Sequence, residues 1–294
     1  MQSVVALGNF DGVHIGHAAV IDCTVKLAAK LQCTPLVYSF STHPQQFFGS
    51  TLPLLTTTEE KQKEICRLGI QTQIYDDFAL VCALSAEDFV RQILVKKLSA
   101  KAVVTGPDYF FGKGKEGNVD LLKEFGKKYG FSVYTVPFAT IGGEKVSSSA
   151  LRRHIAAGEM EETAQKLGRP YEMEGAVVSG KGLARKWGTP TVNVTLPPEK
   201  AVPRFGVYAV ELVTDTVWQG VCNVGVRPSF DDGNTPNMEV HVLNGAPIVG
   251  ERATVRFLQF LRDEKKFLTQ ALISQIQADC ERAQQFFEER SAAK

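Results

Sequence analysis

The sequence predicts an α/β protein with two domains: an open parallel sheet with helices, followed by a small antiparallel β-barrel and a terminal helix. Strands alternate with helices in the first half, short strands follow one another in the second half, and the last segment has one apolar helical face. The 294 residues suffice for two ordinary domains. We place the boundary at the Gly168-Arg169-Pro170 linker, which gives domains of residues 1–168 and 169–294.

The first half has the pattern of βαβ units. Apolar runs typical of strands alternate with segments whose apolar residues recur at helical spacing. We predict strands at residues 3–8, 35–40, 71–75, 102–105 and 131–137, and helices at residues 16–29, 58–68, 86–98, 119–129, 147–157 and 160–167. Ligands of such sheets bind beyond the carboxyl ends of the strands.

The second half has the pattern of a barrel, because its short apolar segments are separated by Gly, Pro and Asn-Gly turns. We predict strands at residues 171–178, 191–196, 206–213, 217–226, 237–243 and 252–260. In residues 269–289, one helical face carries Leu272, Ile276, Cys280, Ala283 and Phe287. We expect this helix to pack against the barrel.

The bulk composition argues against several function classes. The net charge of +1 does not indicate a nucleic-acid surface, and no apolar run approaches the roughly 18 residues that span a bilayer. The short apolar N-terminus predicts a first strand rather than a signal peptide. The six cysteines form no CxxC pair, which argues against a zinc site. We expect a cytoplasmic protein that binds neither nucleic acid nor membrane, and its oligomeric state is left open.

The most informative stretch, GNFDGVHIGH at residues 8–17, lies between the first strand and the first helix. Its glycines permit close approach of a phosphate to backbone amides, and the helix N-terminus favours anions. His14 and His17 are three residues apart, so they project to one side at a helix start. Two imidazoles there can donate hydrogen bonds to phosphate oxygens during phosphoryl transfer. A purely structural role for the histidines is the alternative.

This stretch resembles the HxGH signature of the nucleotidyltransferase superfamily, in the form found in bacterial bifunctional riboflavin kinase/FAD synthetases. Three more segments match that family in order: FSTHP at residues 40–44, GPDYFFG at 106–112 and VSSSALR at 146–152. They are similar to its F..HP segment, its GxDFxFG loop and its ISSTxIR motif. The resemblance implies a Rossmann-like nucleotidyltransferase domain at the N-terminus.

The resemblance implies adenylyl transfer from ATP to FMN, which gives FAD and pyrophosphate. The residues expected to bind ATP are Gly8, Phe10, Asp11, Gly12, His14, His17, Ser147, Ser148 and Arg152, with the two histidines as the catalytic pair. Asp108 and Phe110 would lie near the flavin or the nucleotide. Without the family, Ser147-Ser148 is an ordinary helix N-cap, a role compatible with phosphate binding. Ala150 and Phe111 stand where the family often has arginine.

In the second half, GTPTVN at residues 188–193 resembles the GFPTAN motif of riboflavin kinases. Mg²⁺ prefers hard oxygen ligands, and the side chains of Thr191 and Asn193 point to one face of a strand. The resemblance implies that they bind Mg²⁺. Glu239, in NMEVH, matches the family's vEvH strand, where the carboxylate takes the proton of the riboflavin 5′-hydroxyl. Without the family, PTVN is a strand start and Glu239 a solvated side chain.

The kinase half departs from the family at its flap. The family's segment, roughly GDGRGRTLG, is GKGLARKWG at residues 180–188, so Leu183 and Ala184 replace an arginine and a glycine. Asn244-Gly245 stands where the family usually has an acidic D-F pair. The flap residues expected to face ATP are Gly180, Gly182, Arg185 and Lys186.

These features favour a bifunctional enzyme that phosphorylates riboflavin to FMN and adenylylates FMN to FAD, with ATP as co-substrate and Mg²⁺ as cofactor. One alternative is a monofunctional FAD synthetase with an impaired kinase module, which the altered flap motivates. Another is a non-catalytic flavin- or nucleotide-binding regulator, which the two histidines oppose. A different small-molecule adenylyl- or cytidylyltransferase is the third, and the PTxN and vEvH segments oppose it.

Overall fold

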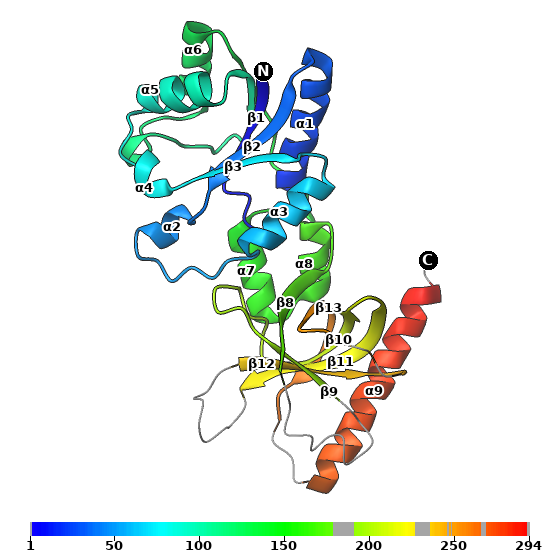
Figure 1. Ribbon diagram of the computed structural model, residues 1–294. Helices are drawn as coiled ribbons and strands as arrows, with labels where there is room; N and C mark the ends of the chain where they lie inside the picture. The colour runs from blue at the N-terminus through cyan, green and yellow to red at the C-terminus, as the bar shows by residue number, and fades with distance from the viewer. Residues whose placement is uncertain are drawn as a thin grey trace. The chain divides into compact units, whose positions relative to one another are not determined.

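The computed structural model describes residues 2–178, 191–226, 236–245, 247, 249–265 and 269–292. The chain forms two compact units, Met1–Ala150 and Leu151–Lys294 (Figure 1). The domain boundary expected at residue 168 is a statement about which fragment can fold alone. It stays a prediction. Within the described residues, no helix is both long and apolar enough to cross a bilayer.

The first unit is built on a five-stranded parallel sheet with the strand order β3-β2-β1-β4-β5. The strands are β1 (Ser3–Leu7), β2 (Thr34–Phe40), β3 (Thr72–Asp76), β4 (Ala100–Thr105) and β5 (Ser132–Thr135). The first strand lies in the middle, so the turn that follows β1 opens at the centre of the sheet's carboxyl edge. The parallel sheet predicted from the alternating pattern is confirmed.

Helices cover both faces of this sheet, with α1 on one face and α5 and α6 on the other (Figure 1). The helices are α1 (Ile15–Leu31), α2 (Pro44–Phe47), α3 (Thr58–Arg67), α4 (Phe78–Val81), α5 (Ala86–Asp88), the π-helix η1 (Phe89–Lys97), the short 3₁₀ turn η2 (Lys113–Lys115) and α6 (Val119–Tyr129). A hairpin of β6 (Thr140–Ile141) and β7 (Glu144–Lys145) leads to α7 (Ser148–Ala157).

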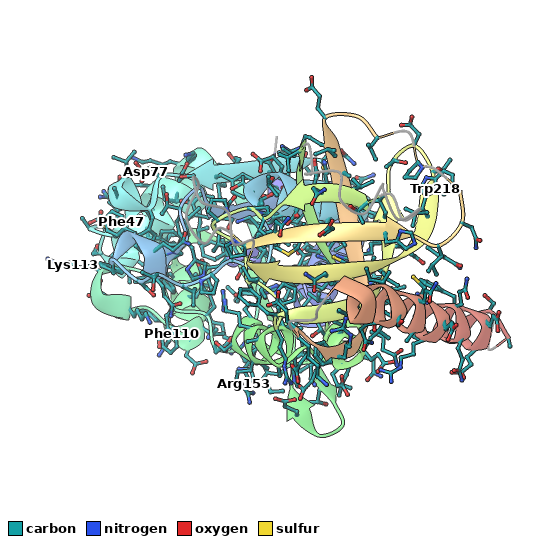
Figure 2. The ribbon with its side chains drawn as sticks, turned by 90° about the horizontal axis from the view of Figure 1, so that it is seen from below. Phe47, Asp77, Phe110, Lys113, Arg153 and Trp218 are labelled. Atoms are coloured by element: carbon teal, nitrogen blue, oxygen red, sulfur yellow. The ribbon has the colours of Figure 1, made fainter. Side chains whose placement is uncertain are left out.

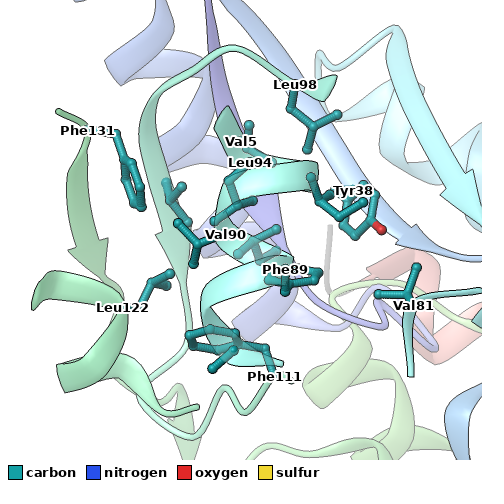
Figure 3. Close-up of a cluster of buried hydrophobic side chains, with 14 of the residues drawn as sticks. Val5, Tyr38, Val81, Phe89, Val90, Leu94, Leu98, Phe111, Leu122 and Phe131 are labelled. Carbon is teal, nitrogen blue, oxygen red and sulfur yellow. The ribbon is translucent and has the colours of Figure 1, made fainter. Parts of the chain in front are cut away.

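Two apolar cores result from the alternation of side chains along the strands. On one face, Val5 and Tyr38 of the sheet pack with Phe89 and Leu94 of η1 and with Leu122 of α6 (Figure 3). On the other face, alternate strand residues pack against α1 and α3. The buried strands explain the near-continuous apolar runs in the sequence.

The helical segment predicted at residues 86–98 is confirmed, but only its first turn is α-helical. The structure has one short α-helical turn, α5, and then the wider π-helix η1, in which the Leu98 amide donates to the Ile93 carbonyl at 2.9 Å. Both helix types present apolar residues to the core at similar intervals, so the pattern does not separate them.

The second unit is a closed antiparallel barrel with the strand order β10-β11-β12-β9-β8-β13, closed between β13 and β10. The strands are β8 (Tyr171–Val178), β9 (Thr191–Thr195), β10 (Gly206–Val213), β11 (Val217–Val226), β12 (Pro236–Val242) and β13 (Arg252–Asp263). A Cβ at Gly175 would lie 1.9 Å from the Thr195 carbonyl oxygen, so only glycine fits where β8 approaches β9. The predicted barrel is confirmed.

The helix α9 (Thr269–Ala292) packs against the barrel as its apolar face predicts. Ala283 and Phe287 contact a cluster that includes Val207 of β10 and Val221 of β11. Arg262 of β13 donates three hydrogen bonds to the buried carboxylate of Asp279, two from Nε at 2.8 and 3.1 Å and one from Nη2 at 2.6 Å. This paired charge fixes the helix on the barrel.

We predict that residues 169–294 fold alone, because the barrel has its own core and closing helix. A fragment of residues 151–294 should have a free energy of unfolding higher by a few kcal/mol, because α8 (Met160–Leu167) adds the buried side chains of Met160 and Leu167. Urea unfolding followed by circular dichroism measures both fragments. If the shorter fragment shows no cooperative transition, the boundary at residue 168 is wrong.

Candidate functional site

The turn between β1 and α1 holds an unusual backbone. Phe10 and Val13 have φ values of 51° and 41°, and Gly12 has 84°. Left-handed conformations are unfavourable for residues other than glycine, and they persist where the surroundings enforce them. Here Phe10 and Val13 are buried in the core under the sheet, so packing enforces the turn.

The two histidines lie face to face at the start of α1. Their ring centroids are 3.7 Å apart and the planes differ by 13°. His14 is the N-cap, and its Nδ1 accepts a hydrogen bond from the His17 amide at 3.3 Å. Because Nδ1 accepts, a neutral His14 ring carries its proton on Nε2, which is then a donor. The rings of His14 and His17 project to the same side of the helix start, as expected.

Gly16 makes room for this pair. A Cβ at this position would lie 3.2 Å from both Cε1 and Nδ1 of His14. Any side chain would therefore press on the ring that caps the helix. The glycine of HxGH is favoured here by the close approach of the imidazole, and not by its backbone conformation.

The environment keeps His17 neutral at pH 7. Burial lowers the pKa of His17 well below its usual value, and the nearby positive charges of His14 and Lys61 lower it further. The ring Nδ1 is buried and has no hydrogen-bond partner in the part of the chain that the structure describes. A bound anion would favour the protonated form of this ring.

Asp11 fixes the turn to two distant segments. Its buried carboxylate accepts hydrogen bonds from the amides of Leu55 at 2.9 Å and Thr56 at 3.3 Å. Its carbonyl oxygen accepts one from the hydroxyl of Ser148 at 3.0 Å, although the two residues are 137 positions apart. The first and last motifs of the N-terminal half thus meet at one place.

The predicted ATP-binding residues divide into two groups. Phe10 and Asp11 are buried, and the Phe10 ring contacts His17 edge-on at 5.3 Å, so their side chains support the turn. Ser147 caps α7 by accepting a hydrogen bond from the Ala150 amide at 3.2 Å, and Arg152 follows Ser148 by one helical turn. Contacts of these residues with ATP stay predictions.

The loop after β4 carries the two residues expected near the flavin. Asp108 is exposed and pairs with Lys145 of β7, with 2.9 Å between Oδ2 and Nζ. The Phe110 side chain is also exposed (Figure 2), whereas Phe111 is buried in the core (Figure 3). Aligned with GxDFxFG, Phe111 takes the place of the motif's second phenylalanine and not of an arginine, and its core position explains why an apolar side chain fits there.

The sequence prediction missed a cluster of aromatic rings after β2 and β3. Phe47, Phe48 and Phe78 contact one another edge-on, with centroids 5.2 to 5.8 Å apart. Phe48 is 74% exposed and Phe47 is 41% exposed. Figure 2 labels Phe47. Large exposed rings at the carboxyl edge of a sheet form an apolar surface suited to a planar ligand. The only sequence signal for this cluster was the pair Phe47-Phe48, which follows His43-Pro44.

The predicted kinase residues meet on neighbouring strands of the barrel. Asn193 of β9 lies opposite Glu239 of β12, and the Thr191 hydroxyl donates a hydrogen bond to Glu239 Oε1 at 2.8 Å. Asn193 is buried, and its Oδ1 accepts a hydrogen bond from Asn237 Nδ2 at 3.4 Å. The expectation of a purely solvated Glu239 therefore does not hold.

These oxygens fit a hard cation. A hydroxyl and an amide oxygen two residues apart are ligands that Mg²⁺ accepts, with phosphate and water completing the shell. The four flap residues Gly180, Gly182, Arg185 and Lys186, together with Leu183 and Ala184, lie outside the described residues.

Comparison with known proteins assigns both halves. The family model described as FAD synthetase matches residues 1–150, and the model described as riboflavin kinase matches residues 167–287. The bifunctional riboflavin kinase/FMN adenylyltransferase of Pseudomonas fluorescens is 36% identical over 281 residues, which cover 94% of this chain and 90% of the relative. The chain belongs to the bifunctional riboflavin kinase/FMN adenylyltransferase family.

Two further matches extend over almost the whole chain. The family member of Listeria monocytogenes is 34% identical over 294 residues, 98% of this chain and 93% of the relative. A crystal structure of a Streptococcus pneumoniae protein named macrolide-efflux protein superposes with a TM-score of 0.87 at 30% identity. It covers 96% of this chain and 94% of its own, so both units of this family member share its fold.

The depressed pKa of His17 predicts a pH dependence of stability. The unfolded chain binds a proton on this ring below about pH 6.5, and the folded protein does not until lower pH, so stability is lost as the pH falls. Between pH 8 and pH 5, His17→Asn should lose less of its free energy of unfolding than the wild type, because it lacks the imidazole that the unfolded chain protonates. Urea unfolding at both pH values measures this, and equal losses in the two proteins would contradict it.

Proposed function

We propose that the chain makes FAD from riboflavin in two ATP-dependent steps, one in each unit. The barrel transfers the γ-phosphoryl group of ATP to riboflavin, giving FMN and ADP. The sheet domain transfers the adenylyl group of a second ATP to FMN, giving FAD and pyrophosphate. Family membership supports the two reactions. Cytoplasmic residence belongs to the same proposal, because both steps consume ATP.

The observation that carries the adenylyl site is the meeting of the histidine turn with the start of α7 through the Ser148–Asp11 hydrogen bond. Two helix N-termini, α1 and α7, then supply backbone amides and positive dipole ends to one place. His14, His17 and Arg152 would add side-chain donors. Such a constellation is suited to a triphosphate and to the charge that develops on it.

The adenylyl transfer needs no general base. An ionised oxygen of the FMN phosphate attacks the α-phosphorus of ATP, and the bond from that phosphorus to the bridging oxygen breaks as pyrophosphate leaves. Catalysis is therefore positioning and charge stabilisation. The Nε2–H of His14 and the protonated ring of His17 would donate to phosphate oxygens. Asp108 and Phe110 would lie near the flavin, and the rings of Phe47, Phe48 and Phe78 would support it from their exposed faces.

The kinase step needs a base. The Glu239 carboxylate would accept the proton of the riboflavin 5′-hydroxyl as its oxygen attacks the γ-phosphorus and ADP leaves. The Thr191 hydroxyl, 2.8 Å from Oε1, holds that carboxylate in place. Thr191 and Asn193 would hold Mg²⁺, which when bound neutralises charge on the ATP phosphates. The flap residues Gly180, Gly182, Arg185 and Lys186 would cover those phosphates, and the Thr191–Glu239 contact speaks against an impaired kinase module.

The two constellations predict separable losses of activity. His14→Ala or His17→Ala should lower conversion of supplied FMN to FAD by about 100-fold or more, because phosphate donors are lost. Asn193→Ala or Glu239→Gln should abolish conversion of riboflavin to FMN. Each variant should retain the other conversion, since that site is built from the other half of the chain. Chromatographic separation of riboflavin, FMN and FAD measures all four.

Each variant is assayed for both conversions, so the conversion that should be retained serves as the control for folding. A variant that loses both conversions is misfolded and decides nothing about mechanism, so circular dichroism accompanies each assay. Unchanged FAD synthesis in a folded His17→Ala protein would remove this histidine from the mechanism. Unchanged FMN synthesis in Glu239→Gln would remove the proposed base.

A further inference from the structure

A lysine on α3 reaches the histidine turn. The segment before α3 is held by the Asp11 carboxylate through the amides of Leu55 and Thr56, so the first turn of α3 lies against the β1–α1 turn. From there Lys61 places its Nζ 3.5 Å from the carbonyl oxygen of Asn9. The same Nζ lies 5.2 Å from the centroid of the Tyr75 ring.

Several lysines of this unit pair with a carboxylate, and Lys61 does not do so among the described residues. Lys26, Lys97 and Lys128 each contact a carboxylate oxygen at 2.5 to 2.7 Å. In the part of the chain that the structure describes, the ammonium group of Lys61 has only the long contact to the Asn9 carbonyl as a hydrogen bond. An ammonium group carries three donors, so its hydrogen-bonding capacity is largely unmet by the protein.

The ammonium group of Lys61 is partly buried, and among the described residues it forms no ion pair with a carboxylate. Burial lowers the pKa of Lys61, and the attraction of Asp11 opposes this. The Asp11 carboxylate already accepts hydrogen bonds from two backbone amides. Lys61 in turn lowers the pKa of His17, which places both basic groups at the same turn. A partly buried cation beside the histidine turn and the start of α1 is an arrangement that an anion would relieve.

We propose that Lys61 binds a phosphate group of ATP in the adenylyl-transfer site, as a third cationic side chain beside His14 and His17. This proposal rests on the proposed function, because it names the anion as the nucleotide of that reaction. The structural role that competes with it, packing of the lysine stem against Tyr75, needs no charge. Lys61→Met retains the stem and removes the charge, so it separates the two roles.

The test compares Lys61→Met, Lys61→Arg and Lys63→Met, where Lys63 is an exposed lysine on the same helix. We expect kcat/KM for FAD formation from FMN and ATP to fall by about 30-fold or more in Lys61→Met, as for the loss of one charged phosphate contact. Lys61→Arg keeps the charge and should lose less than tenfold. Lys63→Met should stay within about twofold of the wild type. Riboflavin phosphorylation should be unchanged in all three.

Thermal unfolding gives a readout that does not depend on turnover. The Tm of ligand-free Lys61→Met should equal or exceed that of the wild type, because removal of an unbalanced half-buried charge relieves its desolvation. Inorganic pyrophosphate should raise the Tm of the wild type and of Lys63→Met, and should raise that of Lys61→Met much less.

Two outcomes would overturn the proposal. One is a Lys61→Met protein with a lowered Tm and reduced activity in both conversions, which would make the lysine structural. The other is a Lys61→Met protein that matches Lys63→Met in kcat/KM and in its response to pyrophosphate. Failure of the proposed function looks different, because the wild type itself would then form no FAD.

Discussion

The buried carboxylate of Asp11 is the interaction on which the N-terminal site depends. A buried carboxylate is costly unless its oxygens are satisfied, and here the amides of Leu55 and Thr56 satisfy it. The Gly12 amide donates back to the Thr56 hydroxyl at 3.1 Å, and Ser148 donates to the Asp11 carbonyl. Segments from three parts of the chain are thereby held at one turn, which brings the start of α1, the first turn of α3 and the start of α7 together. The positions of His14, His17 and Lys61 follow from this arrangement.

The second unit places its chemistry by a different means. Cross-strand register in the closed barrel sets Asn193 opposite Glu239, and the Thr191 hydroxyl then fixes the carboxylate. A site built from loops and helix N-termini suits a triphosphate, because many backbone amides can approach it. A pair of strands suits a base and a few metal ligands, because it holds them rigidly. The two reactions attack different phosphorus atoms of ATP with different nucleophiles, and each unit provides a constellation suited to one of them.

Much of this was predictable from the sequence, because apolar periodicity locates strands and helices. The HxGH motif lies at a helix start, PTxN at a strand start and vEvH within a strand. The rest was not predictable, for physical reasons. The π-helix η1 shares its apolar spacing with an α-helix, so no pattern separates them. Lys61 lies in TEEKQKE, which has the composition of a solvated helix surface, and only the tertiary contact of α3 with the turn reveals its burial. The burial of Phe10 and Asp11, and the exposure of Phe47 and Phe48, likewise depend on packing that local sequence does not encode.

The most direct test of the account is a time course of the full-length chain with riboflavin, excess ATP and Mg²⁺, with the flavins resolved by chromatography. The account predicts that FMN appears first, that FAD follows, and that riboflavin is consumed in step with their sum. If riboflavin is not consumed, while the same protein converts separately supplied FMN to FAD, the bifunctional assignment is contradicted and only the N-terminal activity is left. Accumulation of FMN that never becomes FAD would contradict the role of the histidine turn.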